Sequence, residues 1–364
     1  MNDAQTGNIT GHNTIASALT NIVTGKEDAN FSSPNGKYNF FTCSSNTLKC
    51  DEYAFNASSI LIAGNGEFNV KHYTGKFNAY QRTYVINPTT ENVDIKYLYY
   101  CLGLSLKSLK SISQGTSTKF LTATIINNLP IKLPSIRSQK QIVSILSSLD
   151  NKIKLNRRIN ENLEQQAQAL FKSWFVDNKN NKLQYYELGD ITLITAGGDK
   201  PSVYSKDLTE QCRIPIYSNG TENEGLYGYT TSAKINSASI TISARGTIGY
   251  VCLRTEPYVP IVRLISVVPN IENLSAEYLY LWALTQNING TGTTQQQLTV
   301  PNFRHTLIGI PTKEKMIRFN NIVFPIFQRI VINKNENKIL SQLRDTLLPR
   351  LMSGKLEIKD NSYD

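Results

Sequence analysis

The chain has 364 residues, of which 40% are hydrophobic, and a formal net charge of +10. This length is too great for one ordinary core and indicates two or more domains. No apolar run approaches the roughly 18 residues of a membrane span, and residues 1–5 lack the basic and apolar regions of a signal peptide. We therefore expect a cytoplasmic protein with no membrane partner.

The positive charge favours a polyanionic partner, because lysine and arginine release counterions when they bind nucleic acid. The five cysteines form no CxxC pair, and the chain has three histidines. These counts predict no metal site and no hydrolytic triad. The sequence also lacks a GxxxxGK phosphate loop followed by Ser or Thr.

Two copies of one unit fill the chain, and their second halves are displaced by 177 positions. The matching pairs include Gly115-Thr116 and Gly292-Thr293, Leu121-Thr122 and Leu298-Thr299, Pro134 and Pro311, Ile145 and Ile322, and Leu170 and Leu347. A repeat of this length indicates that the function belongs to a unit that is used twice.

Within each copy, an irregular, strand-rich part comes first. Short β-branched segments bounded by Gly, Asn or Pro predict strands at residues 59–62 and 82–86 in the first copy, and at 240–242 and 264–268 in the second. Apolar spacing predicts a short helix at 95–99 and another at 276–280. Each copy is therefore expected to begin with an α+β globular domain.

After Pro134 and Pro311, apolar residues are spaced alternately four and three apart. They are Ile142, Leu146, Leu149, Ile153, Leu163, Ala167, Leu170 and Trp174 in the first copy, and Phe319, Val323, Ile326, Ile330, Leu340, Leu347 and Leu351 in the second. A mean spacing of about 3.5 is typical of a coiled-coil seam. Four asparagines also fall on the seams, where they either fix the register or lie at a frayed, solvated point: Asn156, Asn160, Asn333 and Asn337.

At about 1.5 Å per residue, each helix of roughly 35 to 40 residues is about 55 Å long. Antiparallel pairing would bury both seams and place one globular domain at each end of a rod. The expected fold is α+β, with two globular domains in a pseudo-two-fold tandem repeat, separated by two long helices that form an antiparallel coiled coil.

The helical segments resemble those of the specificity subunits of type I restriction-modification systems. The first helix carries Leu133-Pro134, Gln139 and Ile142-Val143, which are similar to the start of that family's first spacer helix. The second carries Asn335-Glu336-Asn337, Leu340, Leu343-Arg344-Asp345 and residues 347–354, which are similar to its C-terminal repeat. Two departures are noted: Met316 stands where the first copy has Gln139, and nothing in residues 1–38 corresponds to Leu188-Gly189-Asp190.

The resemblance implies target recognition domains at 1–134 and 185–311, a spacer helix at 135–178, and a second spacer helix with a C-terminal tail at 312–356. It also implies a non-catalytic, DNA-binding subunit of a host-defence system, with each domain reading half of a split target in double-stranded DNA. The implied partners are two modification subunits that use S-adenosylmethionine to methylate adenine, and restriction subunits that use ATP and Mg. No cofactor is expected on this chain itself.

Base reading requires polar side chains on loops that reach a groove edge. Two pairs of loops meet this requirement, and they differ between the copies. The first pair contains Asn65 in one copy, and Arg245 with Thr247 in the other. The second pair contains Thr116, Thr118 and Lys119 in one copy, and Thr294, Gln295 and Gln296 in the other. The alternative is that these loops are ordinary hairpin turns.

Five further cations are either phosphate ligands or solvated charges: Lys71, Lys76, Arg82, Arg254 and Arg304. Trp174 and Phe175, at the end of the first helix, belong either to the helix core or to a docking surface for the modification subunit.

Two alternative functions are a DNA adenine methyltransferase and a structural or carbohydrate-binding repeat protein. A DNA adenine methyltransferase with its own recognition domain would need an Asn-Pro-Pro-aromatic loop, but Asn87-Pro88 is followed by Thr89-Thr90. A structural or carbohydrate-binding repeat protein with a coiled-coil stalk would not account for the basic charge.

Overall fold

The computed structural model describes residues 11–66, 68–112, 120–178, 182–288 and 297–356. The chain divides into two compact units, the first made of residues 1–155 and 336–364 and the second of residues 156–335. Each unit therefore contains a globular part and a segment of each long helix. No described helix is long and apolar enough to cross a membrane.

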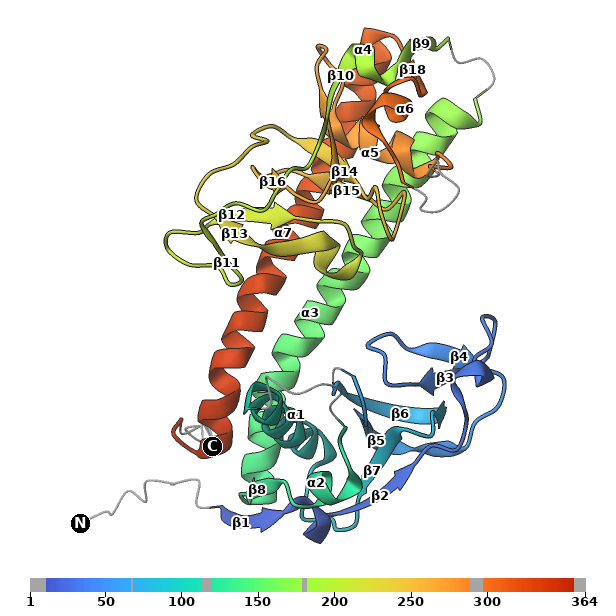
Figure 1. The fold of residues 1–364 in the computed structure, drawn as a ribbon. Coiled ribbons are helices and arrows are strands. Elements are labelled where there is room, and N and C mark those ends of the chain that lie inside the picture. The colour runs from blue at the N-terminus through green and yellow to red at the C-terminus, as the bar shows by residue number, and fades with distance from the viewer. Residues whose placement is uncertain (1–10, 67, 113–119, 179–181, 289–296, 357–364) are drawn as a thin grey trace, which may run out of the picture. The chain divides into compact units, whose positions relative to one another are not determined.

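The first unit is built on one six-stranded sheet with the order β2-β7-β5-β6-β3-β4, shown in blue in Figure 1. Neighbouring strands are antiparallel except β3 and β6. The strands are β1 (His12–Ile15), β2 (Thr20–Thr24), β3 (Tyr38–Phe41), β4 (Leu48–Cys50), β5 (Phe55–Ala63), β6 (Val70–Ala79), β7 (Thr83–Pro88) and β8 (Pro130–Leu133). The helices of this part are α1 (Ile95–Ile112) and α2 (Ala123–Asn127), with 3-10 turns at Ala16–Ala18 and Ala29–Phe31.

The two faces of this sheet are buried differently. Side chains alternate along β5, so Ile60 and Ile62 face α1 and pack against a core that includes Tyr97. Leu61 belongs to a separate cluster with Phe77. Because both faces are covered, residues 60–63 form a continuous buried apolar run instead of an alternating one.

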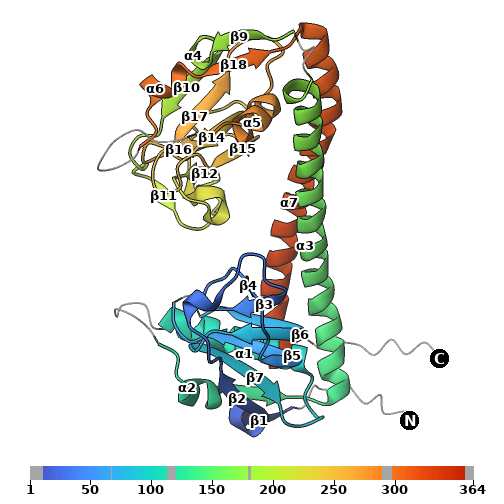
Figure 2. The ribbon, with the colours of Figure 1, turned by 90° about the vertical axis from the view of Figure 1, so that its right-hand side faces the viewer.

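The second unit has two four-stranded sheets, β10-β17-β14-β15 and β11-β13-β12-β16. Its strands are β9 (Gln184–Glu187), β10 (Thr192–Ala196), β11 (Tyr204–Ser205), β12 (Ile214–Tyr217), β13 (Leu226–Thr230), β14 (Ser239–Ile242), β15 (Val251–Arg254), β16 (Val259–Pro260), β17 (Ile265–Pro269) and β18 (Leu307–Ile310). Its short helices are α4 (Leu188–Ile191), α5 (Ala276–Leu284) and α6 (Val300–Arg304), with a 3-10 turn at Glu222–Gly225. Within this unit, α4, β9 and β18 lie together at one end (Figure 2).

Matching hydrogen bonds show that the two units repeat one fold. The Tyr97 hydroxyl donates to the Lys132 carbonyl and the Tyr278 hydroxyl to the Gly309 carbonyl, both at 2.6 Å. Strand β1 pairs with β8 as β9 pairs with β18. The strands and short helices expected from sequence are confirmed, although α1 extends well beyond residue 99.

The start of the first copy has a structural counterpart, contrary to the sequence-based expectation. The Thr20 hydroxyl donates to the Ala16 carbonyl at 2.8 Å, and the Thr192 hydroxyl donates to the Leu188 carbonyl at 2.6 Å. In both copies a helical turn thus joins two strands. The 3-10 turn at Ala16–Ala18 replaces α4, and it shares no residue pattern with Leu188-Gly189-Asp190.

The long helices are α3 (Ile136–Phe171), which continues into a π-helical turn (Lys172–Val176), and α7 (Lys313–Ser353). Seam residues are buried as the spacing predicts, among them Ile142, Leu146, Ile153, Ala167, Phe319, Val323, Ile330 and Leu351. Within each unit the two helix segments lie side by side and run antiparallel (Figures 1 and 2). In the second unit, for example, Asn160 contacts Asn333 and Trp174 contacts Phe319. The α+β class, the tandem repeat and the antiparallel helix pairing are therefore confirmed.

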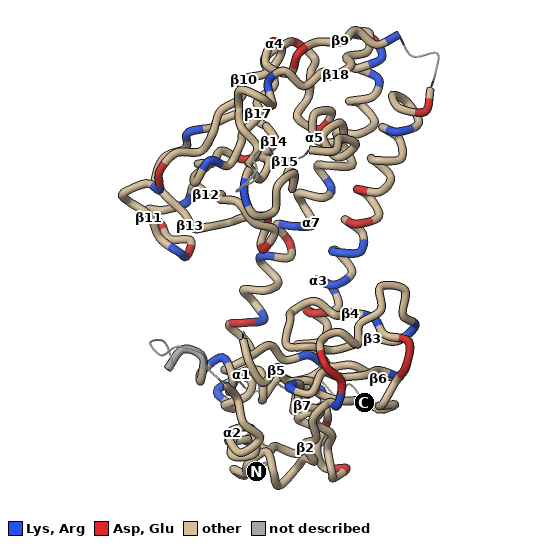
Figure 3. The backbone as a smooth tube through the Cα atoms, turned by 45° about the vertical axis from the view of Figure 1, so that its right-hand side comes forward, with Lys and Arg blue, Asp and Glu red and all other residues tan. Residues whose placement is uncertain are grey.

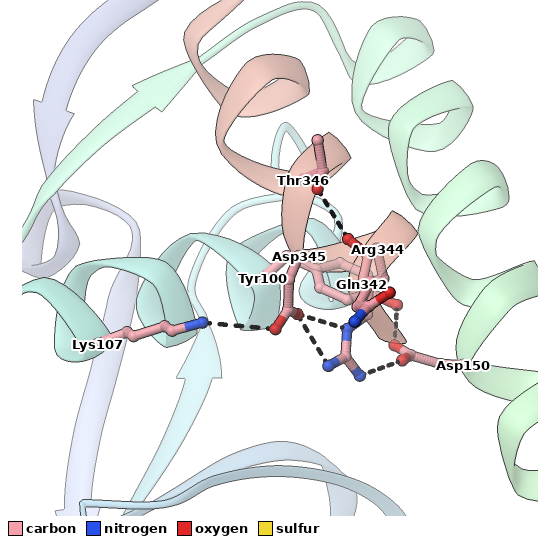
Figure 4. A network of polar contacts seen from close by, with 7 residues as sticks. All are labelled: Tyr100, Lys107, Asp150, Gln342, Arg344, Asp345 and Thr346. Atoms are coloured by element: carbon pink, nitrogen blue, oxygen red, sulfur yellow. Dashed lines mark hydrogen bonds and ion pairs between the residues drawn. The ribbon is translucent and has the colours of Figure 1, made fainter. Parts of the chain in front are cut away.

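A polar network joins α1, α3 and α7 within the first unit (Figure 4). The Tyr100 hydroxyl donates to Asp150 at 2.6 Å, and Arg344 donates to the other oxygen of that carboxylate at 2.9 Å. Arg344 also binds Asp345, which Lys107 approaches at 3.5 Å. Burial raises the pKa of Tyr100, and the hydrogen bond to Asp150 raises it further. The tyrosine therefore acts as a neutral donor.

Candidate nucleic-acid interface

The loop after β5, the turn before β7 and the segment before α2 meet at one edge of the first unit's sheet. The Gly64 amide donates to the Arg82 carbonyl and the Leu121 amide donates to the Gly64 carbonyl, both at 2.8 Å. Asn65 follows β5 and forms an isolated bridge with Phe120. The structure thus brings the predicted residues Asn65 and Arg82 to the same edge.

Lys71 is held close to this edge by a neighbouring loop. Its ammonium donates to the Ser44 carbonyl at 2.9 Å and lies 5.7 Å from the centre of the Phe41 ring. Partial burial lowers the pKa of Lys71. Lys76 lies further along β6, exposed, with its ammonium 4.6 Å from the Tyr53 ring centre.

The equivalent edge of the second unit carries Arg245, which is exposed. The Leu298 amide donates to the Ala244 carbonyl at 3.1 Å, as Leu121 does to Gly64 in the first unit. Arg245 therefore occupies the position of Asn65. Its Nε and Nη2 donate to the Gln297 Oε1 at 3.2 and 2.9 Å, and Arg263 Nη1 approaches the same oxygen at 3.5 Å.

Arg263 lies in a tight turn at a strained backbone position. Val262 and Arg263 have φ angles of 52° and 61°, which cost non-glycine residues of order 1–3 kcal/mol each. The turn is stabilised by Asn219, whose Nδ2 donates to the Val262 carbonyl at 2.7 Å, and by the Val262 amide, which donates to Gly198 at 2.9 Å. Local strain of this kind clusters at functional sites.

Thr247 and Arg304 occupy different surroundings. Thr247 is exposed in the loop after β14, and its carbonyl accepts from the Tyr250 amide at 3.1 Å. Arg304 ends α6 and packs over Gly189 of α4. The structure therefore groups Thr247 with the Arg245 loop and places Arg304 at α4.

Six of the predicted contacts lie outside the described residues. They are Thr116, Thr118, Lys119, Thr294, Gln295 and Gln296.

Contrary to the sequence-based expectation, Arg254 is neither a phosphate ligand nor a solvated charge. Its side chain is only 4% exposed. The guanidinium stacks on Tyr217 at 3.5 Å and donates to the Glu224 carbonyl at 2.6 Å and to the Thr241 hydroxyl at 3.0 Å. Elsewhere, basic residues are distributed over the loops of both units (Figure 3).

The predicted register and docking residues fall on the long helices. Asn333 is fully buried and donates to the Asn160 Oδ1 at 2.8 Å, while Asn156 is also buried and Asn337 is half-buried. Phe175 is buried among Phe171, Tyr278 and Phe319, so it is a core residue of the second unit and not an accessible docking residue. Trp174 is half-buried beside it, and its docking role stays a prediction.

Three residues at these edges were not predicted from the sequence as candidate DNA contacts: Arg263, Gln297 and Phe120. The signal for Arg263 was the spacing to a strand-ending proline, because Arg82 and Arg263 each stand six positions before Pro88 and Pro269. Phe120 and Gln297 were detectable as the residues before the repeated Leu-Thr pairs. No cluster of three His, Cys, Asp or Glu side chains that suits a metal ion occurs in the described part of the chain.

Comparison with known proteins identifies relatives. Residues 17–165 and 180–347 match the family model for the type I restriction modification DNA specificity domain. The EcoDI specificity subunit of Escherichia coli is 39% identical over 131 residues, which is 36% of this chain and 29% of that protein. A putative type I specificity subunit of Mycoplasma pneumoniae is 28% identical over 71% of this chain and 81% of its own length. The crystal structure of an S subunit from M. genitalium shares the fold, with a TM-score of 0.59 over 98% of each chain at 18% identity.

Proposed function

This chain belongs to the type I restriction-modification DNA specificity family, and from that premise we propose that it selects the DNA sequence on which a type I complex acts. The proposed target is bipartite, with one half-site read by each unit. The observation that carries this proposal is the double family match, at residues 17–165 and 180–347, to two units that repeat one fold.

The difference between the reading edges supports separate half-sites. Asn65 and Arg245 occupy equivalent positions, but an amide and a guanidinium present different hydrogen-bonding groups to a base. By contrast, the buried tyrosines Tyr97 and Tyr278 keep the same hydrogen bond in both units. Different side chains at equivalent loop positions are what two different half-sites require.

In this proposal the chain contributes recognition and not catalysis. Two modification subunits bring S-adenosylmethionine and methylate adenine, and restriction subunits use ATP and Mg to act on DNA. The chain itself binds no cofactor and acts with them in the cytoplasm. The missing Asn-Pro-Pro-aromatic loop supports this division of labour, because adenine methylation then has to come from a partner.

The proposal is tested by mapping methylated adenines across the host genome with and without this chain. We expect one split motif to lose its methylation on deletion and to regain it when the chain is restored. An unchanged methylation pattern, in cells that express all the subunits, would refute the proposal.

Arg245 offers a narrower test. We expect Arg245→Ala to reduce discrimination in one half-site, with a base contact contributing roughly 1–3 kcal/mol. An even loss of affinity across sequences would instead identify Arg245 as a phosphate contact. Full discrimination in both half-sites would exclude a base-reading role.

A further inference from the structure

Three positions recur together at the reading edge of each unit. The first lies in the loop after a central strand, β5 or β14, next to the matched residues Gly64 and Ala244. The second lies in the turn before β7 or β17. The third precedes the leucine whose amide binds Gly64 or Ala244, and it is occupied by Phe120 or Gln297.

The second position is equivalent by its hydrogen bonds as well as by its spacing. The Thr83 amide closes a turn on the Tyr80 carbonyl at 2.7 Å, and the Leu264 amide closes one on the Ile261 carbonyl at 3.1 Å. Arg82 and Arg263 are the third residues of these turns. The two arginines thus occupy equivalent positions in the chain.

From this placement we propose that these three positions form the specificity-determining set of each unit, with Phe120 and Arg263 as DNA contacts. The first unit presents Asn65, Arg82 and Phe120. The second presents Arg245, Arg263 and Gln297. This inference rests on the proposed function, because it names the residues through which each half-site is read.

The second unit's set is suited to acceptor groups of DNA. Both Arg245 and Arg263 are exposed and approach one neutral oxygen, Oε1 of Gln297. No ion pair among the described residues joins either guanidinium to a carboxylate. Two like charges held at one acceptor favour a ligand that accepts hydrogen bonds, either a phosphate oxygen or the O6 and N7 edge of guanine.

The first unit's set is suited to a base face or a base step. Phe120 is 54% exposed although it is aromatic and bridges to Asn65. In nucleic-acid-binding proteins, exposed aromatic rings can stack on a base or insert between base pairs. The same position thus holds the aromatic ring of Phe120 in one unit, and in the other it holds Gln297, whose amide oxygen accepts hydrogen bonds from the two arginines.

The test uses the full chain in its complex with the modification subunit, on the duplex defined by the methylation map. Arg263→Gly is the key variant, because glycine removes the guanidinium while accepting the positive φ. We expect its thermal stability to be kept or raised, and its discrimination to fall about 5- to 150-fold at one half-site only. Arg213→Ala, which removes another exposed arginine of that unit, is the control.

Phe120→Ala is expected to reduce discrimination at the other half-site, and Phe120→Tyr to restore it by keeping a ring that stacks. Ile125→Ala is its control, since Ile125 is also exposed, at 40%, in the same unit. If Arg263→Gly weakens binding to all sequences alike and reduces the slope of log K against log salt concentration by about 0.9, its ligand is a phosphate. That result would overturn the specificity role proposed for Arg263, because phosphate contacts carry no sequence information.

Two negative results have different meanings. If the wild-type complex shows no sequence preference on any duplex, the proposed function fails. If the wild-type complex discriminates, while Arg263→Gly and Phe120→Ala behave like Arg213→Ala and Ile125→Ala, the specificity-determining set is overturned and the proposed function stands.

Discussion

Arg254 is held inside the second unit by stacking and hydrogen bonding at once. It contacts the ring of Tyr217, the Thr241 hydroxyl and the Glu224 carbonyl. Glu224 in turn forms an ion pair with Lys334 of α7. A planar, permanently charged guanidinium can make all of these contacts together, which an ammonium cannot.

We predict that Arg254→Ala lowers the free energy of unfolding of the second unit by about 2 kcal/mol, because it removes packing and leaves buried polar groups without donors. Arg254→Lys should recover less than half of the loss. Arg213→Ala should stay within about 0.5 kcal/mol of wild type. Chemical unfolding checks these values, and an equally small effect at Arg254 would contradict the burial described.

Glu277 provides a pH-dependent prediction. It lies at the start of α5 and is buried, and this burial raises the pKa of its carboxyl above the ordinary value. At a pH between the unfolded and the native pKa, the native state therefore holds a proton that the unfolded state has released. Its stabilising contribution is complete below the unfolded pKa and is lost as pH rises through the raised native pKa.

Glu277→Gln should remove this dependence. Above pH 4.5 the wild type should lose stability relative to the variant, with a slope of at most about 1.4 kcal/mol per pH unit, up to the native pKa. Unfolding measured as a function of pH checks the difference between the two curves. Parallel curves would show that Glu277 titrates alike in both states.

At the scale of elements, the seam asparagines couple α3 to α7 within the second unit. Asn333 donates to Asn160, and Asn160 Nδ2 donates to the Ile330 carbonyl at 3.3 Å. We predict that Asn160→Leu or Asn333→Leu alone costs about 1–2 kcal/mol, because each leaves an amide unsatisfied. The double variant should cost less than the sum, with a coupling of at least about 1 kcal/mol.

A double-mutant cycle measures that coupling. Additive effects, within about 0.3 kcal/mol, would exclude an energetic link between the two asparagines. The register role further predicts faster amide exchange along the helices in the double variant, since an all-leucine seam accepts more than one alignment.

Element boundaries show which features the sequence makes predictable. The two long helices are predicted correctly because burial sets their apolar periodicity, as at Ile142 and Leu146. The central strands are predicted correctly from short β-branched runs, as at Ile60 to Ile62. The second unit's small sheet, β11-β13-β12-β16, is not predicted from the sequence, because its strands have two to five residues and little alternation. The burial of Arg254 is not predictable from the sequence either, because it depends on partners that are distant along the chain.

The link between the long helix and the loop before the short helix is made by a different residue in each copy. In the first copy Gln139 accepts from the Asp94 amide and donates to the Asn92 carbonyl, which ties α3 to the loop before α1. Met316 is buried and apolar at the matching position, but Asn320, one turn later, bonds Ser275 and the Asn273 carbonyl. Comparison of single positions misses such a replacement. The local environment of the loop reveals it.

At the scale of the whole molecule, one fold is used twice, and the two copies differ at the edges proposed to read DNA. The buried pair Tyr97 and Tyr278 keeps its hydrogen bond in both copies. The loop positions Asn65 and Arg245, which are equivalent in the two copies, differ in their chemistry. Base identity depends on how these loops meet a groove, so the residues predict the location of the reading edge but not the target sequence.

The central claim, that each unit reads one half of a split target, is tested most directly by selection. The full complex would be used to enrich duplexes from a randomised pool at physiological salt, and the bound sequences would be aligned. We predict two short blocks of fixed bases separated by a constant number of unread bases, with Arg263→Gly degrading one block alone. A single continuous block, or two blocks at variable spacing, would contradict the account.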